Sequence, residues 1–245
     1  MRTHPSPLII KQDIHGYRYS IEPFLLADFI QLAPDLRVLD IGTGCGIIPL
    51  LLATRERQIR ITAVEIQESL YRAAAENISK NNLSGSARVI HGNFVALAPE
   101  LDPEGFDLIL SNPPYRKIKT GRINPNREKA IARHEIALSL ESIVKHSVPL
   151  LKTAGRIALT YPPNRLNEVL LELRSRDLHP SRLRFVHGNR GAEAKIFLIE
   201  AVRERRVDCV VESPLFVYKS DNSYTEEMEN IYASFNYTDR TDHLR

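Results

Sequence analysis

The stretch RVLDIGTGCGIIPLLLATRERQIRITAVEI, residues 37–66, sets two short β-branched runs on either side of a longer apolar segment. The two runs, at residues 37–41 and 60–66, have the length and composition of buried strands. Residues 46–54 between them are predicted to form a helix. Because parallel strands need a crossover connection, this order predicts a β-α-β unit.

The same alternation of strand and helix continues along the chain, without internal repeats. Further strands are expected at residues 87–91, 107–111, 156–160, 182–186 and 195–202, and further helices at 23–32, 68–81, 139–151 and 164–175. Gly155 is expected to follow the end of the third of these helices. The last two strands are joined by residues 187–191, a hairpin length. We therefore expect an α/β fold, with a doubly wound, seven-stranded, mostly parallel sheet ending in an antiparallel hairpin.

Composition points to one globular domain and away from membrane or metal proteins. Of the 245 residues, 43% are hydrophobic and 26% are charged, as in one large α/β domain. The longest apolar stretch, residues 47–53, is too short to span a bilayer. Cys45 and Cys209 have neither disulfide-framework nor metal-ligand spacing, so a reducing, cytoplasmic location and no metal are expected. The net charge of +3 means that any basic surface must be local.

The glycine-rich loop after the first strand is a candidate cofactor site. Asp40 ends the strand, and Gly42, Gly44 and Gly46 follow it before the predicted helix. Glycines in this context let the backbone approach a ligand closely. The dinucleotide fingerprint GxGxxG does not fit, because the third glycine comes one residue early. The alternative interpretation is a tight strand-to-helix turn that needs glycine only for positive φ.

An acidic residue, Glu65, closes the second strand nineteen positions after Gly46. Its offset is close to the ~20 residues at which a carboxylate meets the two hydroxyls of a bound ribose. A solvated surface carboxylate is the alternative for such a residue taken alone. Its position after this loop favours the ribose contact.

The fourth predicted strand runs directly into Asn112, Pro113, Pro114 and Tyr115, at the sheet edge where ligands collect. A residue before proline is pushed into the extended region, and proline has no N–H. Asn112 and Pro113 are therefore expected to be rigid, with their carbonyl groups available. Asn-Pro-Pro as a simple turn initiator is the alternative.

The parallel sheet closed by a hairpin, with the glycine loop, Glu65 and the Asn-Pro-Pro-Tyr element, resembles the class I S-adenosylmethionine-dependent methyltransferases over residues 36–202. The resemblance implies that Asp40 reaches the amino end of the cofactor's methionine moiety and that the glycines make room for it. Asn93 and Phe94, after the third strand, are expected to contact the cofactor's adenine. A helix N-cap is the alternative role for Asn93.

The Asn-Pro-Pro-Tyr element suits transfer to a planar nitrogen. The lone pair of an exocyclic amine is delocalised into its ring, and two acceptors on its N–H groups favour a localised lone pair. The side-chain oxygen of Asn112 and the carbonyl of Pro113 are the expected acceptors, while Tyr115 can stack on the base. Attack on the sulfonium methyl is then assisted by positioning and electrostatics rather than by a strong base. Asn112 therefore also borders the cofactor.

A cationic segment follows this element. Residues 116–133 carry seven lysines and arginines against Glu128 alone, a balance of 7 − 1 = +6. Such a segment beside a substrate pocket suits phosphate contacts, which position RNA without specifying its sequence. A solvated charged loop is the alternative. The expected RNA contacts are Lys117, Lys119, Arg122, Arg127, Lys129 and Arg133.

The substrate is left open by the motif alone, because adenine N6, guanine N2 and protein-glutamine methyltransferases share it. Only 39 residues precede Asp40, which argues against the helical domain of the glutamine enzymes. The ends of the chain resemble the bacterial tRNA1(Val) adenine-37 N6-methyltransferase family. The matching residues are Gln12, Gly16, Tyr17, Arg18, Tyr19, Ser20, Leu25, Leu26 and Ala27 at the start, Arg127 and Arg133 in the cationic segment, and Asn222, Ser223, Tyr224, Thr225, Glu226, Glu227, Ile231, Tyr232 and Phe235 at the end.

This resemblance implies methylation of an adenine in a tRNA loop, where a base is extruded at low cost. Glu22 departs from the aspartate expected in many members and keeps its negative charge. One methyltransferase domain, 1–245, is expected, with an N-terminal segment 1–35 over the cofactor site, a catalytic core 36–202 and an extension 203–245. The alternatives are a guanine-N2 rRNA enzyme, a protein-glutamine enzyme or an RNA-binding protein with a relict fold. The oligomeric state is open, with a monomer as the working expectation.

Overall fold

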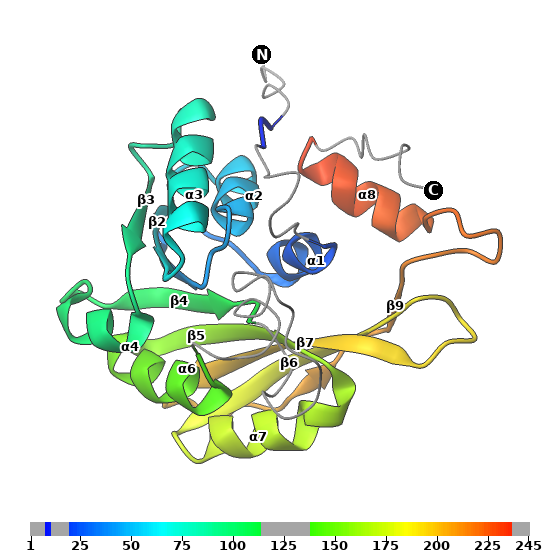
Figure 1. Cartoon of the computed structure of the whole chain (residues 1–245). Helices are drawn as coiled ribbons and strands as arrows, with labels where there is room; N and C mark the ends of the chain where they lie inside the picture. Colours follow the sequence, from blue (N-terminus) through cyan, green and yellow to red (C-terminus); the bar gives the residue numbers. More distant parts are fainter. Residues whose placement is uncertain (1–7, 11–19, 114–137, 237–245) are drawn as a thin grey trace, which may run out of the picture.

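The computed structural model describes residues 8–10, 20–113 and 138–236, which form one mixed sheet with helices on both faces (Figure 1). Its strands follow the order β3-β2-β1-β4-β5-β7-β6-β8, and β9 also pairs with β6. The strands are β1 (Arg37–Ile41), β2 (Arg60–Glu65), β3 (Ala87–His91), β4 (Phe106–Ser111), β5 (Leu151–Tyr161), β6 (Leu178–His187), β7 (Ala194–Arg203), β8 (Val210–Val211) and β9 (Leu215–Phe216).

Strands β1 to β5 are parallel, and β7 runs antiparallel to both β5 and β6. The expected parallel sheet with a terminal hairpin is therefore confirmed, with two short strands added at its edge. The strand order reverses between β1 and β4, which are neighbours although two strands lie between them in the sequence. In doubly wound sheets, a ligand crevice opens at the carboxyl ends of the strands at such a point.

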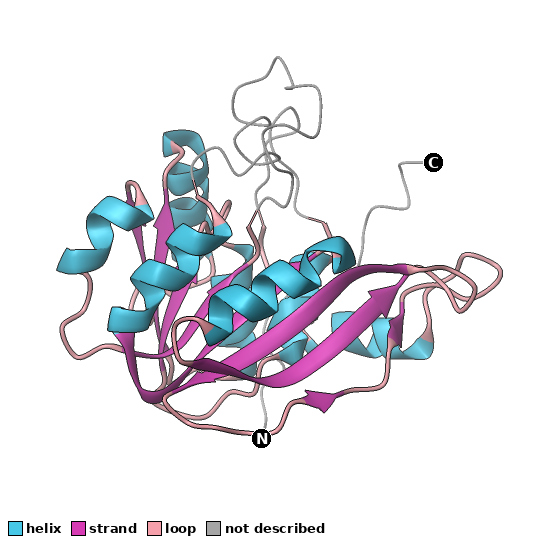
Figure 2. Ribbon diagram, turned by 90° about the horizontal axis from the view of Figure 1, so that it is seen from below, coloured by secondary structure: helices cyan, strands magenta, loops and turns pink. Residues whose placement is uncertain are grey.

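Alternating side chains on the strands create two cores. Val38 and Leu108 face one layer of helices, whereas Leu39 and Ile109 face the other. Successive residues of a strand point to opposite faces, so a sheet buried on both sides needs apolar residues at every position. The first layer holds α1 (Glu22–Phe29), α2 (Ile47–Arg55), α3 (Glu68–Lys80) and α8 (Glu226–Ser234), and the second holds α4 (Phe94–Leu97), α6 (Leu140–Ser147) and α7 (Leu166–Arg174). Figure 2 shows this second layer lying across the sheet.

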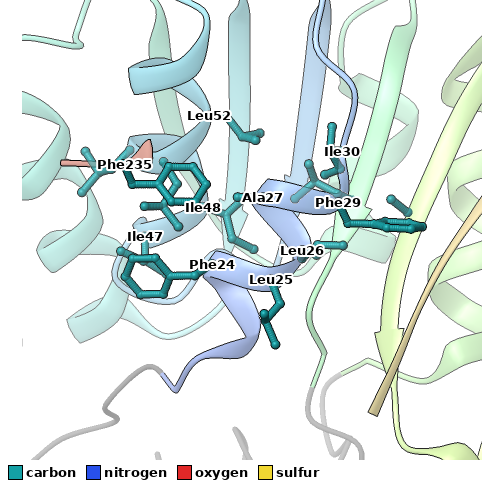
Figure 3. Close-up of a cluster of buried hydrophobic side chains, with 14 of the residues drawn as sticks. Phe24, Leu25, Leu26, Ala27, Phe29, Ile30, Ile47, Ile48, Leu52 and Phe235 are labelled. Atoms are coloured by element: carbon teal, nitrogen blue, oxygen red, sulfur yellow. The ribbon is translucent and has the colours of Figure 1, made fainter. Parts of the chain in front are cut away.

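Helix α1 is apolar on nearly all sides and is buried accordingly. Figure 3 shows Phe24 of this helix close to Ile47 and Ile48 of α2 and to Phe235, which follows α8. The ring of Phe24 meets that of Phe235 edge-on, with 6.0 Å between the ring centroids. The first and last helices of the described chain thus share one core.

Three arginines bind the carbonyl end of α1. Backbone carbonyls at a helix end have no partner within the helix, and cationic donors there also interact favourably with the helix dipole. The bonds run from Arg55 to the carbonyls of Ala27 and Ile30, from Arg156 to that of Gln31, and from Arg182 to that of Phe29. These arginines come from α2, β5 and β6, so α1 is held by three separate elements.

Several element boundaries expected from the sequence are wrong, since β5 and β6 begin at Leu151 and Leu178 rather than at residues 156 and 182. The helix predicted at residues 139–151 ends at Ser147, and a 3-10 turn at Val148–Leu150 leads into β5. Pro149 has no N–H to donate, which disfavours continuation of the α-helix. Gly155 therefore lies inside β5 rather than after a helix, where a Cβ would stand 2.8 Å from the Lys152 carbonyl oxygen. The pairing of β4 with β5 also shifts register here.

Candidate functional site

The glycine loop is fixed to the end of β2. The backbone N–H groups of Gly42 and Thr43 both donate to the carbonyl of Val64, over 2.9 and 3.1 Å. Gly42, Gly44 and Gly46 have φ values of 73°, 60° and 81°, in the left-handed region where glycine is favoured. These positive φ values are what a tight strand-to-helix turn, the alternative interpretation of the loop, requires.

Two glycines of the loop serve different purposes. A Cβ at Gly42 would meet no described atom within 4 Å, so there is room for a ligand beside it. A Cβ at Gly46 would stand 3.1 Å from the Cβ of Ala74, because α3 packs directly against the loop. The side chain of Asn77, also on α3, donates to the Cys45 carbonyl over 2.9 Å. The loop is thus packed on one side and open on the other.

Glu65, 4% exposed, binds the loop from the end of β2. One carboxylate oxygen accepts from the Gly44 N–H over 2.8 Å, and the other accepts from the Gln67 N–H over 2.8 Å. Burial raises the pKa of Glu65, and these backbone N–H donors act in the opposite direction. A carboxylate has about four acceptor positions, so this group retains capacity for ligand hydroxyls.

Asp40 is fully buried at the end of β1. Within the described residues, neither carboxylate oxygen has a hydrogen-bond partner, and the nearby hydroxyl of Thr43 also lies outside hydrogen-bonding geometry. Burial raises the pKa of Asp40 to about 7, the Thr43 side chain acts in the opposite direction, and the charge of Glu65 adds to the increase. Buried polar groups are nearly always satisfied, so this carboxylate is suited to receive a polar or cationic ligand group.

Asn93 and Phe94, which follow β3, both make contacts within the protein. The side chain of Asn93 accepts from the Val95 N–H over 2.9 Å and so caps α4, which is the role given above as the alternative. Phe94 is 3% exposed and meets His146 edge-on, with 6.4 Å between the ring centroids. Both residues follow β3, whose last residue, His91, pairs with Glu65 at the end of β2. They therefore lie at the same sheet edge as the loop. Their contacts with a cofactor stay predictions.

Ile66 was not among the residues expected from the sequence. It follows Glu65 directly and is 38% exposed, while its carbonyl lies 3.1 Å from Nε2 of His91. An exposed apolar side chain beside the acidic residue offers a surface for a flat ring. The available clue was an apolar residue directly after the strand-ending acid.

The end of β4 brings Asn112 beside the glycine loop. Asp40 pairs with Leu110 in the sheet. The hydroxyl of Ser111 donates a buried hydrogen bond of 2.7 Å to the Ile41 carbonyl. Asn112 is half-buried and Pro113 is buried. The structure therefore places Asp40, Glu65 and Asn112 at the neighbouring ends of β1, β2 and β4.

Part of the predicted site lies outside the described residues. It comprises Pro114, Tyr115, Lys117, Lys119, Arg122, Arg127, Lys129 and Arg133. In the described part of the chain, no group of three or more His, Cys, Asp or Glu side chains is placed to hold a metal ion. None of the described helices has the length and apolar character needed to cross a membrane.

Comparison with known proteins identifies the family to which the chain belongs. The family model described as the Methyltransferase small domain matches residues 23–161. A tRNA1(Val) (adenine(37)-N6)-methyltransferase from Porphyromonas gingivalis is 35% identical over 66% of this chain and 64% of its own length. A protein of the same name from Christiangramia forsetii is 30% identical over 92% of this chain and 93% of its own.

Solved structures support the fold. A predicted O-methyltransferase from Agrobacterium tumefaciens superposes with a TM-score of 0.69, at 16% identity, covering 88% of this chain and 97% of the other. The hMettl16 catalytic domain gives a TM-score of 0.59 at 20% identity, covering 84% and 78% of the two chains. The fold and the loop at its edge define a class I methyltransferase. Within that class, the chain belongs to the family of the tRNA1(Val) (adenine(37)-N6)-methyltransferases.

Proposed function

We propose that this chain transfers a methyl group from S-adenosylmethionine to the exocyclic N6 of an adenine in tRNA, at position 37 of tRNA1(Val). The relatives named above carry this activity in their names. The observation that carries the proposal is the position of Asn112, which extends from β4 beside a glycine loop open toward the same edge.

The residues present fit the cofactor. Asp40 offers two buried carboxylate oxygens without a described partner, suited to the amino group of the methionine moiety. The open side of Gly42 gives room for the backbone to approach it, and Glu65 has acceptor capacity left for ribose hydroxyls. We also assign Gly44, Gly46, Asn93 and Phe94 to this site. When bound, S-adenosylmethionine supplies an electrophilic methyl group on a sulfonium.

Asn112 and Pro113 prepare the acceptor nitrogen. Their side-chain oxygen and backbone carbonyl can each accept one N–H of the adenine amino group, which localises its lone pair for attack. Since positive charge develops on that nitrogen, two fixed carbonyl dipoles favour the transition state over the ground state. Proline rigidity keeps the carbonyls in place without reorganisation. Pro114 continues this rigid segment, and Tyr115 is assigned to stack on the base.

RNA is the proposed partner because of the cationic segment that follows. Its balance of +6 exceeds the whole chain's +3. Lys117, Lys119, Arg122, Arg127, Lys129 and Arg133 are assigned to phosphate contacts, which supply affinity without sequence specificity. From the proposed tRNA substrate we also infer a cytoplasmic location.

One assay separates the candidate substrates. The protein is incubated with labelled S-adenosylmethionine and, in separate reactions, total tRNA, total rRNA and a release factor, and the nucleosides are then analysed. We expect label in N6-methyladenosine from the tRNA fraction. Label in N2-methylguanosine from rRNA, or only in the protein fraction, would overturn the assignment.

A further inference from the structure

Aromatic side chains gather where the β6–β7 hairpin meets the C-terminal extension. The rings of His187 and Phe216 lie 5.4 Å apart between centroids, and the Arg190 guanidinium lies 5.8 Å from the Phe216 ring. Tyr218 and Tyr224 stack at 5.4 Å with 17° between their planes. We call these five residues the hairpin platform. They lie outside the site already described.

The hairpin platform lies at the same sheet edge as Asn112. Strand β6 runs parallel to β4 and β5. The last residue of β5, Tyr161, lies level with Phe185 of β6, because both residues pair with Phe197 of β7. Strand β6 then continues to His187, so its end extends beyond theirs. Figures 1 and 2 show the hairpin projecting past the other strands. His187 lies three strands across the sheet from Asn112 and three residues further along the strand direction, which gives a distance of roughly 15–20 Å between them. That separation is wider than one nucleotide and suits a folded RNA arm.

The hairpin platform has a fixed backbone. The N–H groups of Val217 and Tyr218 donate to the carbonyls of His187 and Gly188, over 3.0 and 2.8 Å. The imidazole Nδ1 of His187 lies 2.8 Å from the Ala192 carbonyl oxygen across the turn. A surface ordered before binding loses less conformational entropy when a ligand arrives.

The chemistry of the hairpin platform fits nucleic acid better than protein. Tyr218 is 37% exposed and is the only exposed large hydrophobic side chain that the described residues place there. Protein interfaces have apolar centres, whereas single-stranded nucleic acid is bound by aromatic stacking combined with cations. Arg190, Lys195 and Lys219 are exposed near these residues in the sequence, against Glu193 and Asp221. With this small excess of positive charge, stacking is the main source of affinity.

We propose that the hairpin platform is a second RNA contact, which stacks an unpaired base of the substrate on Tyr218 while Arg190 holds a phosphate. This contact rests on the proposed tRNA substrate. It would bind the RNA away from the adenine that is methylated, and so align the loop with Asn112.

Two substitutions at exposed positions test this contact. In Tyr218→Ala the stacking ring is lost, and in Arg190→Glu the cation is reversed. Tyr218→Phe keeps the ring, and Arg205→Glu makes the same charge change after β7, at the opposite sheet edge. The readouts are equilibrium binding of a tRNA1(Val) transcript, the KM for that RNA and the Kd for S-adenosylmethionine.

Loss of one stacked base predicts roughly tenfold weaker RNA binding and a raised KM for RNA in Tyr218→Ala. We expect a similar loss in Arg190→Glu, an unchanged cofactor Kd, and values within twofold of wild type in both controls. Wild-type binding and KM in both test variants would overturn the contact while leaving the methyltransferase proposal intact. A wild-type protein that binds RNA through these residues but methylates only a protein would overturn the proposed function instead. Absence of RNA binding by the wild-type protein would overturn both.

Discussion

The carboxylate of Glu65 accepts the backbone N–H of Gly44 over 2.8 Å, so the end of β2 helps to shape the loop at the end of β1. Its other oxygen accepts from Gln67, at the start of the connection to α3. The residue expected from the sequence as a ribose ligand is therefore also a support for the glycine loop. Its replacement should affect folding and cofactor binding together.

Glu65→Gln should weaken both properties. The amide has one acceptor oxygen, so one of the two backbone N–H groups loses its partner, at a cost of about 1–3 kcal/mol in unfolding free energy. We expect cofactor affinity to fall about tenfold or more. Urea unfolding and calorimetric titration measure the two effects. Glu68→Gln, on the exposed surface of α3, is the control, and an equal result for both variants would refute this role of Glu65.

The two ends of the glycine loop should respond differently to a methyl group. Gly42→Ala strains the left-handed backbone, at about 1–2 kcal/mol, and its Cβ enters the open space assigned to the cofactor. Gly46→Ala carries the same strain and also presses on Ala74, so it should lower the unfolding free energy further. Gly42→Ala should therefore show the greater loss of cofactor affinity relative to its loss of stability. The reverse ranking in unfolding and binding titrations would contradict this assignment.

The buried carboxyl of Asp40 should make the cofactor-free protein less stable as pH rises. Its pKa is raised from 3.8 to about 7, so the folded state holds a proton that the unfolded state releases between these values. Stability from this group is fully present below about pH 4 and is lost as pH rises toward 7. The largest loss of unfolding free energy that this group can cause is on the order of 4 kcal/mol.

Asp40→Asn removes this titration. The unfolding free energy of the variant, relative to that of wild type, should therefore be higher at pH 8 than at pH 5. Urea unfolding without cofactor at the two pH values measures the difference. Asp35→Asn, an exposed position that already has positive φ, is the matched control and should show no such trend. A pH-independent difference between Asp40→Asn and wild type would show that Asp40 is ionised in the folded protein.

Asn112→Ala should abolish methyl transfer and leave cofactor binding largely intact. Removing one fixed dipole from a transition-state site typically costs 10²–10³ in rate, so we expect kcat to fall by at least about a hundredfold. Single-turnover transfer and cofactor titration separate the two effects. Asn230→Ala, on the exposed surface of α8, serves as the control. Full activity in Asn112→Ala would disprove the proposed chemistry.

The arrangement of the site was predictable because strand order fixes it. Asp40, Glu65 and Asn112 each end or follow a parallel strand, and neighbouring parallel strands end at one sheet edge. The hydrogen bond from the Gly44 N–H to Glu65 could not be predicted from the sequence, since it depends on a loop conformation set by three positive φ angles. The two possible roles of Asn93 were also inseparable from sequence, because an asparagine can cap a helix and contact a ligand.

Element boundaries were harder to predict where local preferences compete. Residues 148–155 combine apolar spacing typical of a helix with Pro149 and Gly155, and the pairing with β4 determines the outcome. The short helix α4 has four residues, too few for a periodic pattern to identify. For residues 148–155 the deciding contacts come from another part of the chain.

The arginines around α1 bear on how the chain folds during synthesis. Helix α1 emerges from the ribosome early, yet Arg182, which binds the Phe29 carbonyl, is 153 residues further along. Phe235, which packs on Phe24, is made later still. Although domains generally fold from the N-terminus as they are made, α1 cannot complete its contacts until the chain is nearly finished. A nascent chain stalled before residue 182 should therefore expose its first helix to proteases or chaperones.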